Sequence, residues 1–306
     1  MSMQGRPAGR PCIDCHKINL KMLKNRLIPV LLLRNGIIVQ SRGFKRYQPL
    51  GNPVAMVRRL KVWTADELLY LDISPDAIYD TGRDDHGDGN RSSLLDIIRD
   101  ISDACFMPLT FGGRIRSIDD MRQYLAAGAD KVTINTQAIA NPEFISEGAK
   151  VFGAQCIVVS IDVKINDNGD YEVYTERGRV PTNLDPVKWA KEAEERGAGE
   201  IFLNSVDRDG TGKGYDLNLI KKVTDSVSIP MIACGGVGEW AHFAEGLEKG
   251  GASAVAAANI FNYTEQSVYN AKKYLYENGF SVRKPALIDD TLRDRSSAKN
   301  PLLALR

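Results

Sequence analysis

Short apolar runs alternate with amphipathic stretches along most of the chain. The apolar runs have the length of buried strands, and the amphipathic stretches repeat apolar residues at helical spacing. Strands are predicted at Ile28–Leu33, Glu67–Asp72, Met107–Phe111, Lys131–Asn135, Cys156–Asp162, Glu200–Val206, Pro230–Cys234 and Ala254–Ala258. Helices are predicted at Val54–Trp63, Ser93–Ser102, Ile118–Ala127, Pro142–Phe152, Asp185–Arg196, Leu217–Ser226, Trp240–Lys249 and Thr264–Asn278.

Eight strands alternating with eight helices predict an α/β fold, a (β/α)8 TIM barrel. A doubly wound parallel sheet is the alternative, because it uses the same alternation. An internal repeat favours the barrel. Gly235 follows Gly112 by 123 positions, and Ser253 follows Asp130 by the same 123 positions. One offset shared by two separated motifs indicates a duplicated half-barrel.

Two glycine-rich strand ends predict two anion sites. Gly112 and Gly113 follow the third predicted strand, and Gly235 and Gly236 follow the seventh. Glycine has no Cβ, so an anion can approach the backbone N–H groups closely. Two such cradles, half a protein apart, suit a small molecule with a phosphate at each end.

Composition narrows the classes of partner. The 306-residue chain is 43% hydrophobic and has a formal net charge of +1, which gives no general reason to expect nucleic acid or a membrane surface. It contains neither an apolar run of about 18 residues, as a membrane span needs, nor a signal peptide, so a cytoplasmic location is predicted. We divide the chain into an N-terminal extension (1–21), a barrel (22–282) and a C-terminal tail (283–306).

No metal or organic cofactor is predicted. Cys12 and Cys15 form the sequence Cys-Ile-Asp-Cys-His, which is compatible with half a zinc site, a redox pair or haem attachment. No second Cys/His pair follows at zinc-ligand spacing, so incidental cysteines in a flexible leader are the preferred interpretation. The glycine-rich loop 74–90 is a candidate lid. Its acidic segment 83–89 lacks the closing Glu of a calcium loop. Asn168-Gly169 predicts a hairpin turn.

The chemistry of a TIM barrel lies where strands end and loops begin. Asp162 ends an apolar strand and is a candidate general acid or base; the alternative is a carboxylate that caps the following turn. Asp207 and Asp209 follow the next strand and are candidates to orient substrate hydroxyls, with an ordinary acidic turn as the alternative. The other strand ends carry small or amide residues. Asn135, Thr136, Ala258 and Asn259 are candidates for phosphate binding, and Asn204 is a candidate substrate-binding residue.

Five motifs, in order along the chain, resemble those of HisF, the cyclase subunit of imidazole glycerol phosphate synthase. The resemblance runs from about Met22 to Val282. The motifs are Lys131-Val-Thr-Ile-Asn-Thr136, Ser160-Ile-Asp-Val-Lys164, Arg196-Gly-Ala-Gly-Glu200, Ser205-Val-Asp-Arg-Asp-Gly-Thr211 and Ala233-Cys-Gly-Gly-Val-Gly238.

The resemblance implies a barrel that docks a HisH-like glutaminase at its N-terminal face. Ammonia passes through such barrels to the C-terminal face. There it reacts with a bis-phosphorylated ribulosyl substrate, giving imidazole glycerol phosphate and an aminoimidazole carboxamide ribotide. The family's charged ring at the ammonia entrance matches Arg26, Glu67, Lys131 and Glu200, at strand starts. A structural network of salt bridges is the alternative for these four residues.

The sequence departs from the HisF pattern at residues expected on the C-terminal face of the barrel. HisF uses two aspartates, of which the second matches Asp162 and the first falls on Leu32. Leucine cannot exchange a proton, and loss of one acid/base partner typically removes about 10²–10⁴-fold in rate. The basic residue expected a few positions on is Gln40, and the third glycine expected after Gly113 is Arg114. Arg114 either adds a charge-assisted clamp on an anion or fills the first cradle.

These observations lead to one main hypothesis and two alternatives. The main hypothesis is a HisF-like subunit that receives ammonia from a HisH-like glutaminase and delivers it to a different acceptor. HisF-like proteins of this kind act in surface-polysaccharide (LPS) systems, where an N-acetyl sugar amidotransferase helps to convert an acetamido group to an acetamidino group. The alternatives are the cyclase of histidine biosynthesis and a scaffold, without catalytic activity, that activates the glutaminase.

Overall fold

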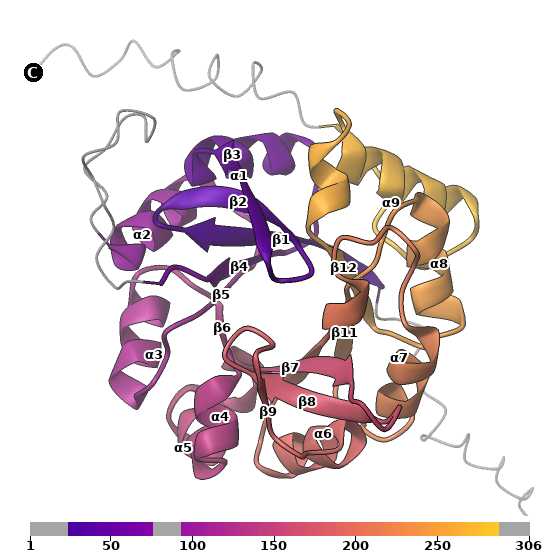
Figure 1. The fold of residues 1–306 in the computed structure, drawn as a ribbon. Helices are drawn as coiled ribbons and strands as arrows, with labels where there is room; N and C mark the ends of the chain where they lie inside the picture. The colour runs from indigo at the N-terminus through magenta and orange to yellow at the C-terminus, as the bar shows by residue number, and fades with distance from the viewer. Residues whose placement is uncertain (1–23, 76–92, 288–306) are drawn as a thin grey trace, which may run out of the picture.

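The computed structural model describes residues 24–75 and 93–287. In this part of the chain, eight parallel strands form a closed ring in which each strand pairs with the next and the last pairs with the first (Figure 1). The closed ring confirms the TIM barrel and excludes the doubly wound sheet. The strands are β1 (Arg26–Arg34), β4 (Leu68–Asp72), β5 (Leu109–Gly112), β6 (Lys131–Ile134), β7 (Ile157–Ile165), β10 (Glu200–Ser205), β11 (Met231–Cys234) and β12 (Ala254–Ala257).

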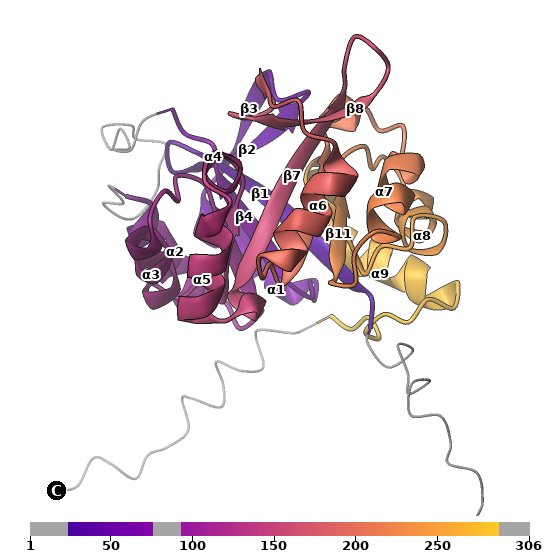
Figure 2. The same ribbon diagram turned by 90° about the horizontal axis from the view of Figure 1, so that it is seen from below.

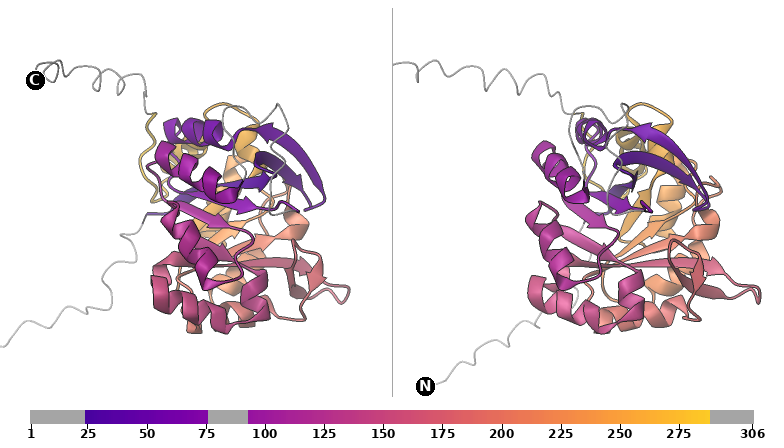
Figure 3. Two further views of the ribbon diagram at one scale, coloured as in Figure 1. Left: turned by 90° about the vertical axis from the view of Figure 1, so that its left-hand side faces the viewer. Right: turned by 60° about the vertical axis from the view of Figure 1, so that its left-hand side comes forward.

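Helices surround the barrel (Figure 3), and all eight predicted helices occur within a few residues of their predicted bounds. Ser93 and Ser117 begin two of them with capping boxes, in which the hydroxyl accepts the backbone N–H three residues on. Within residues 24–75 and 93–287, one further α-helix, α4, is too short to show helical periodicity. The helices are α1 (Pro53–Val62), α2 (Leu94–Ala104), α3 (Ile118–Ala126), α4 (Thr136–Ala140), α5 (Glu143–Phe152), α6 (Pro186–Glu195), α7 (Leu217–Thr224), α8 (Trp240–Glu248) and α9 (Ser267–Glu277).

Two antiparallel extensions stand at the same end of the barrel (Figure 2). β2 (Ile37–Arg42) and β3 (Arg46–Gly51) continue β1, and β8 (Tyr171–Thr175) and β9 (Val180–Pro181) continue β7. The predicted turn at Asn168-Gly169 is confirmed, because β7 and β8 pair on either side of it. The β1–β2 turn was not predicted, although Asn35-Gly36 is its signal: both residues have positive φ, as a two-residue hairpin requires.

The core has two layers, because successive residues of a strand face opposite sides. Leu27, Leu31 and Leu33 of β1 belong to the larger cluster, between strands and helices. Ile28, Val30 and Leu32 alternate with them and belong to the smaller cluster, inside the barrel. Leu32 is therefore one of the apolar residues that fill the barrel interior.

Several predictions lie outside the described residues. These are the N-terminal extension with Cys12 and Cys15, the acidic segment 83–89, and most of both the candidate lid and the tail. The division of the chain into three parts therefore stays a prediction. No helix among the described residues is long and apolar enough to cross a membrane.

Candidate functional site

The four strand-start charges form a closed ring at the N-terminal end of the barrel. Arg26 Nη1 lies 2.6 Å from Glu67 Oε2, and its Nη2 contacts Glu200 Oε1. Lys131 Nζ lies 2.6 Å from Glu67 Oε1 and 3.0 Å from Glu200 Oε2. Each cation thus touches both carboxylates, so positive and negative groups alternate around the opening.

Burial by itself lowers the pKa of Arg26 and of Lys131. The adjacent Glu200 and Glu67 carboxylates outweigh that effect and hold both pKa values above their ordinary range. The two glutamate side chains are only 4% and 7% exposed, and the two cations are their ion-pair partners. Arg26 and Lys131 therefore stay charged at neutral pH, and the ring covers the bottom of the barrel. The structure is compatible with both a gate and a structural network, and the gate role stays a prediction.

A polar column leads from the ring along β6. Lys131, Thr133 and Asn135 occupy alternate positions, which face the barrel interior. The Thr133 hydroxyl and the side-chain amide oxygen of Asn135 (Oδ1) are buried without a hydrogen-bond partner among the described residues. Asn135 Nδ2 donates to Asp162 Oδ2 at 2.9 Å. One strand therefore carries unsatisfied polar atoms from the ring towards Asp162, and such atoms are uncommon unless water or a ligand completes them.

A cavity of about 260 Å³ opens at the C-terminal end of the strands. It brings together residues of strands far apart in sequence, as the ends of barrel strands do. The lining residues that the sequence predicted are Leu32, Gly113, Arg114, Asn135, Thr136, Asp162, Asn204, Asp209 and Ala258.

Asp162 is a buried carboxylate of this cavity. Its Oδ1 accepts from Asn204 Nδ2 at 3.3 Å, and its Oδ2 accepts from Asn135. Burial raises the pKa of Asp162 to about 7, the nearby Asp209 carboxylate adds to the rise, and the two amide donors oppose it. β7 continues past Asp162 to Ile165, so the turn-capping alternative is wrong. A carboxyl group that titrates near neutral pH is suited to general acid–base chemistry.

Leu32 stands where a second carboxylate would be needed. Its Cα pairs across the sheet with Leu71, as Asp162 pairs with Asn204 in the other half of the barrel. The side chain is 8% exposed and joins the apolar interior cluster. Leu32, the residue equivalent to Asp162, thus has no side-chain group that can donate or accept a proton.

The strand registers show that the 123-residue offset of the internal repeat is wrong by one residue at the first cradle. Leu71 pairs with Gly112, whereas the equivalent Asn204 pairs with Cys234. Gly112 therefore corresponds to Cys234, 122 positions later, and not to Gly235 as the sequence spacing suggested. Consequently Gly113 corresponds to Gly235, and each has φ +99°. The next pair is Arg114 and Gly236, with φ +61° and +104°.

Arg114 occupies a glycine place and turns its guanidinium towards β4. Its Nε donates to Asp72 Oδ2 at 2.9 Å, and its Nη2 donates to the Ser74 carbonyl at 2.7 Å. The Asp72 side chain is fully buried and also accepts from the Ser74 backbone N–H at 3.0 Å. These partners hold Arg114 beside the first cradle. Asp72 and Ser74 also line the cavity, and the only sequence signal for them is their place at a strand end.

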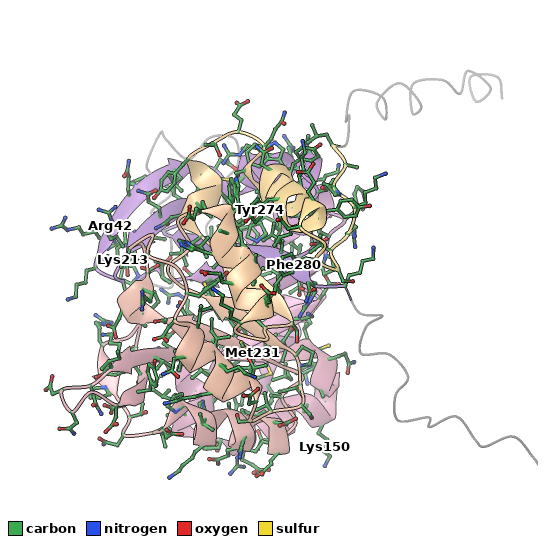
Figure 4. The ribbon with its side chains drawn as sticks, turned by 90° about the vertical axis from the view of Figure 1, so that its right-hand side faces the viewer. Arg42, Lys150, Lys213, Met231, Tyr274 and Phe280 are labelled. Atoms are coloured by element: carbon green, nitrogen blue, oxygen red, sulfur yellow. The ribbon has the colours of Figure 1, made fainter. Side chains whose placement is uncertain are left out.

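Two of the remaining predicted residues, Asp209 and Asn259, hold the β2–β3 hairpin against the barrel. Asp209 Oδ2 accepts from Ser41 Oγ at 3.0 Å, and Asn259 Nδ2 donates to the Ser41 carbonyl at 2.5 Å. Asp207 accepts instead from the Ile165 backbone N–H at 2.8 Å. Figure 4 labels Arg42 of the hairpin and Lys213 of the loop after β10 on the same side of the molecule. The predicted residues that do not line the cavity are Gly112, Asp207, Gly235, Gly236 and Asn259.

Gln40, at the place of the family's basic residue, lies outside the cavity. Its side-chain amide donates to Gln48 Oε1 at 3.0 Å, a cross-strand contact on the exposed side of the hairpin. Within residues 24–75 and 93–287, no three His, Cys, Asp or Glu side chains are placed to bind a metal ion together.

The fold and the site define a TIM-barrel protein with the buried Asp162 carboxylate at one end of the barrel and a charged ring at the other. Residues 26–267 match the model of the family described as histidine biosynthesis protein. The match covers most of the chain, and the chain therefore belongs to this family. Together with the closed barrel, it identifies a HisF-like protein.

Proposed function

We propose that this protein is the synthase subunit of a glutamine amidotransferase. A HisH-like glutaminase docks at the charged ring and releases ammonia, which passes through the barrel to the cavity at the other end. The observation that carries the proposal is the polar column of β6, which joins the ring at Lys131 to the hydrogen-bond partner of Asp162. Thr133 and Asn135 offer unsatisfied oxygens along that route, and ammonia can donate to both.

The acceptor differs from the ribulosyl substrate of the family in this proposal. Imidazole ring formation needs proton transfers at two places. Of the two equivalent positions on β1 and β7, Asp162 offers a carboxylate, whereas Leu32 presents a hydrocarbon. An acceptor with an apolar group next to Leu32 and a carbonyl near Asp162 fits the cavity better. The acetamido group of an N-acetyl sugar has both, and its conversion to an acetamidino group, with a separate sugar amidotransferase, would serve surface-polysaccharide synthesis.

The cyclase reaction of histidine biosynthesis is the second candidate. Asp162 favours it, because its pKa of about 7 suits proton transfer and its two amide partners hold it at the cavity. This alternative requires another group to replace the missing aspartate. A scaffold role, with no chemistry in the cavity, is the remaining outcome.

The test is turnover of the ribulosyl substrate by the full chain supplied with ammonium salt. We expect a rate about 10²–10⁴-fold below that of a member with both aspartates. A comparable rate, or robust growth of a cyclase-deficient histidine auxotroph that expresses the chain, would overturn the proposed acceptor. Addition of a HisH-like glutaminase tests the partner: binding that the variant Glu67→Lys abolishes supports docking at the ring. A scaffold would activate the glutaminase without using its ammonia.

A further inference from the structure

A tyrosine on each of the two hairpins stacks on a cation of the barrel strand that the hairpin continues. Arg34 and Lys164 hold equivalent places near the ends of β1 and β7, 130 positions apart. The guanidinium carbon of Arg34 lies 4.9 Å from the centroid of the Tyr47 ring on β3. Lys164 Nζ lies 4.7 Å from the centroid of the Tyr174 ring on β8. A cation at this distance is attracted to the face of the ring, so both tyrosine rings are held in place.

The two tyrosines differ in their relation to the cavity. Tyr47 lines it, whereas Tyr174 does not. Tyr47 is half-buried and packs against the apolar cluster inside the barrel, to which Leu32 belongs. The β1 side of the cavity, which lacks a carboxylate at Leu32, therefore has an aromatic wall beside that residue.

The tip of the β2–β3 hairpin has an unfavourable backbone conformation that several contacts maintain. Gly43 and Phe44 have φ values of +60° and +56°, in the left-handed region that a residue with a Cβ rarely adopts. The Asp209 carbonyl accepts the Gly43 N–H at 3.2 Å, and Asp209 Oδ2 accepts the Phe44 N–H at 3.3 Å. The Tyr47 hydroxyl donates to the Phe44 carbonyl at 2.8 Å. Such strain persists mainly where a site requires it, and here it accompanies two aromatic residues at the cavity.

The aromatic wall is uncharged at neutral pH. Burial raises the pKa of Tyr47, and the nearby guanidinium groups of Arg177 and Arg34 oppose the rise without cancelling it. The phenol therefore keeps its proton. Arg34 covers one face of the Tyr47 ring, which leaves the rest of the ring for a ligand in the cavity.

Polar groups occupy the opposite side of the cavity. Three barrel strands separate β1 from β7 in either direction around the ring, so these two strands face each other across the barrel (Figure 1). The β7 side carries the Asp162 carboxylate and its amide partners Asn135 and Asn204. A sugar ring has apolar C–H faces that pack on aromatic rings, and hydroxyl and amide groups that need hydrogen-bond partners. A cavity with one aromatic side and one polar side matches both.

We propose that Tyr47 is a specificity-determining residue that packs against the ring of the acceptor sugar. The inference rests on the proposed function, which makes an N-acetyl sugar the acceptor, and it adds the residue that recognises the closed sugar ring. With the ring on Tyr47, the acetamido group lies between Leu32 and Asp162, and the hydroxyls face the polar side of the cavity.

The test is saturation-transfer NMR of N-acetylglucosamine with the full chain, which detects weak binding and needs neither a glutaminase nor the complete acceptor. Loss of one aromatic contact predicts about three- to tenfold weaker binding for Tyr47→Ala. Phe106→Ala is the control, because it removes an aromatic ring that is 80% exposed and lies outside the cavity. This control should bind as tightly as the parent. Equal binding by the two variants, or no saturable binding by the parent, would overturn the proposal.

Two further variants separate recognition from folding. Tyr47→Phe keeps the ring and should bind like the parent, although it loses the hydrogen bond to the Phe44 carbonyl. Tyr47→Leu keeps apolar packing inside the barrel, so its melting temperature should stay within about 4–8 °C of the parent while its sugar binding weakens. If Tyr47→Leu binds as tightly as Tyr47→Phe, Tyr47 has only a structural role and the proposal fails.

A ligand control tests the requirement for a closed ring. N-acetylglucosaminitol has the same acetamido group on an open chain, and the parent should bind it more weakly than N-acetylglucosamine. Equal binding of the two ligands would contradict recognition of the ring face. Failure of ammonia transfer would leave all of these binding measurements unchanged, so the proposed function and this inference fail separately.

Discussion

Leu32 and Asp162 hold equivalent places in the two halves of the barrel, one on β1 and the other on β7. Each faces the barrel interior at the same level, and both line one cavity. Leu32 adds apolar surface, whereas Asp162 adds a carboxyl group that titrates near pH 7. The internal symmetry of the fold is thus broken at the position where an acid/base pair would act.

Replacement of Leu32 by Asp should raise ammonia-dependent turnover of the ribulosyl substrate. The expected gain is about 10²–10⁴-fold, because the variant restores a second proton-transfer group. Leu32→Asn is the matched control, since it is polar but has no carboxylate. A gain shared by both variants, or by neither, would mean that loss of the carboxylate is not what limits the cyclase reaction.

The buried Asp162 should make stability fall as pH rises. Its folded pKa of about 7 exceeds the ordinary value of 3.8, so between these pH values the folded protein keeps a proton that the unfolded chain has lost. The free energy of unfolding therefore decreases from about pH 4 to about pH 7, by roughly 1 kcal/mol for each pH unit, and then levels off. Asp162→Asn should lack this loss. Urea unfolding of both proteins from pH 4.5 to 8.5 measures the difference, and parallel curves would contradict the assignment.

Arg114→Gly should destabilise the protein although its backbone conformation favours glycine. The variant leaves the fully buried Asp72 carboxylate without its guanidinium partner, at a cost of about 1–3 kcal/mol. The double variant Asp72→Asn/Arg114→Gly removes the unpaired charge and should recover part of the loss. Chemical denaturation of the two variants and the parent gives both values. Higher stability of the single variant would show that backbone strain outweighs the ion pair.

The stability of the protein should depend on each glutamate of the charged ring. Glu200→Gln leaves Arg26 and Lys131 with one shared carboxylate, Glu67, and should cost about 1–3 kcal/mol, less than a fully buried pair because the cations are 26% and 22% exposed. Glu192→Gln, which breaks an exposed pair on α6, is the control and should cost less than about 0.5 kcal/mol. Equal effects in urea unfolding would mean that water already screens the ring.

Thr133→Val should stabilise the barrel by about 1 kcal/mol. The Thr133 hydroxyl is buried without a partner, so its replacement by a methyl group removes an unsatisfied polar atom at nearly constant volume. Thr110→Val is the control, because the Thr110 hydroxyl donates to Glu67 Oε1 at 3.5 Å and should not gain from removal. If ammonia uses the polar column, Thr133→Val should also slow glutamine-dependent turnover. If Thr133→Val is less stable than the parent, the Thr133 hydroxyl forms a hydrogen bond with a water molecule.

The repeat shows where prediction from sequence succeeded and where it failed. Eight strand patterns predicted the barrel, because each strand is apolar and each helix amphipathic regardless of its partners. The equivalence of Gly112 and Gly235 was wrong by one residue, because strand register depends on pairing across the sheet. Asp72 received no predicted role, since its partner Arg114 lies 42 positions away in sequence.

The sequence alone determined the closed α/β architecture, the family resemblance and the loss of a carboxylate at Leu32. These follow from local periodicity and from residue identities, which need no knowledge of distant contacts. The tertiary structure decided which charges meet. It closed the ring of Arg26, Glu67, Lys131 and Glu200, raised the pKa of Asp162 by burial, and brought Arg177 from a β8–β9 turn to the cavity wall. Electrostatic interactions depend on distance and burial, and only the folded chain sets these.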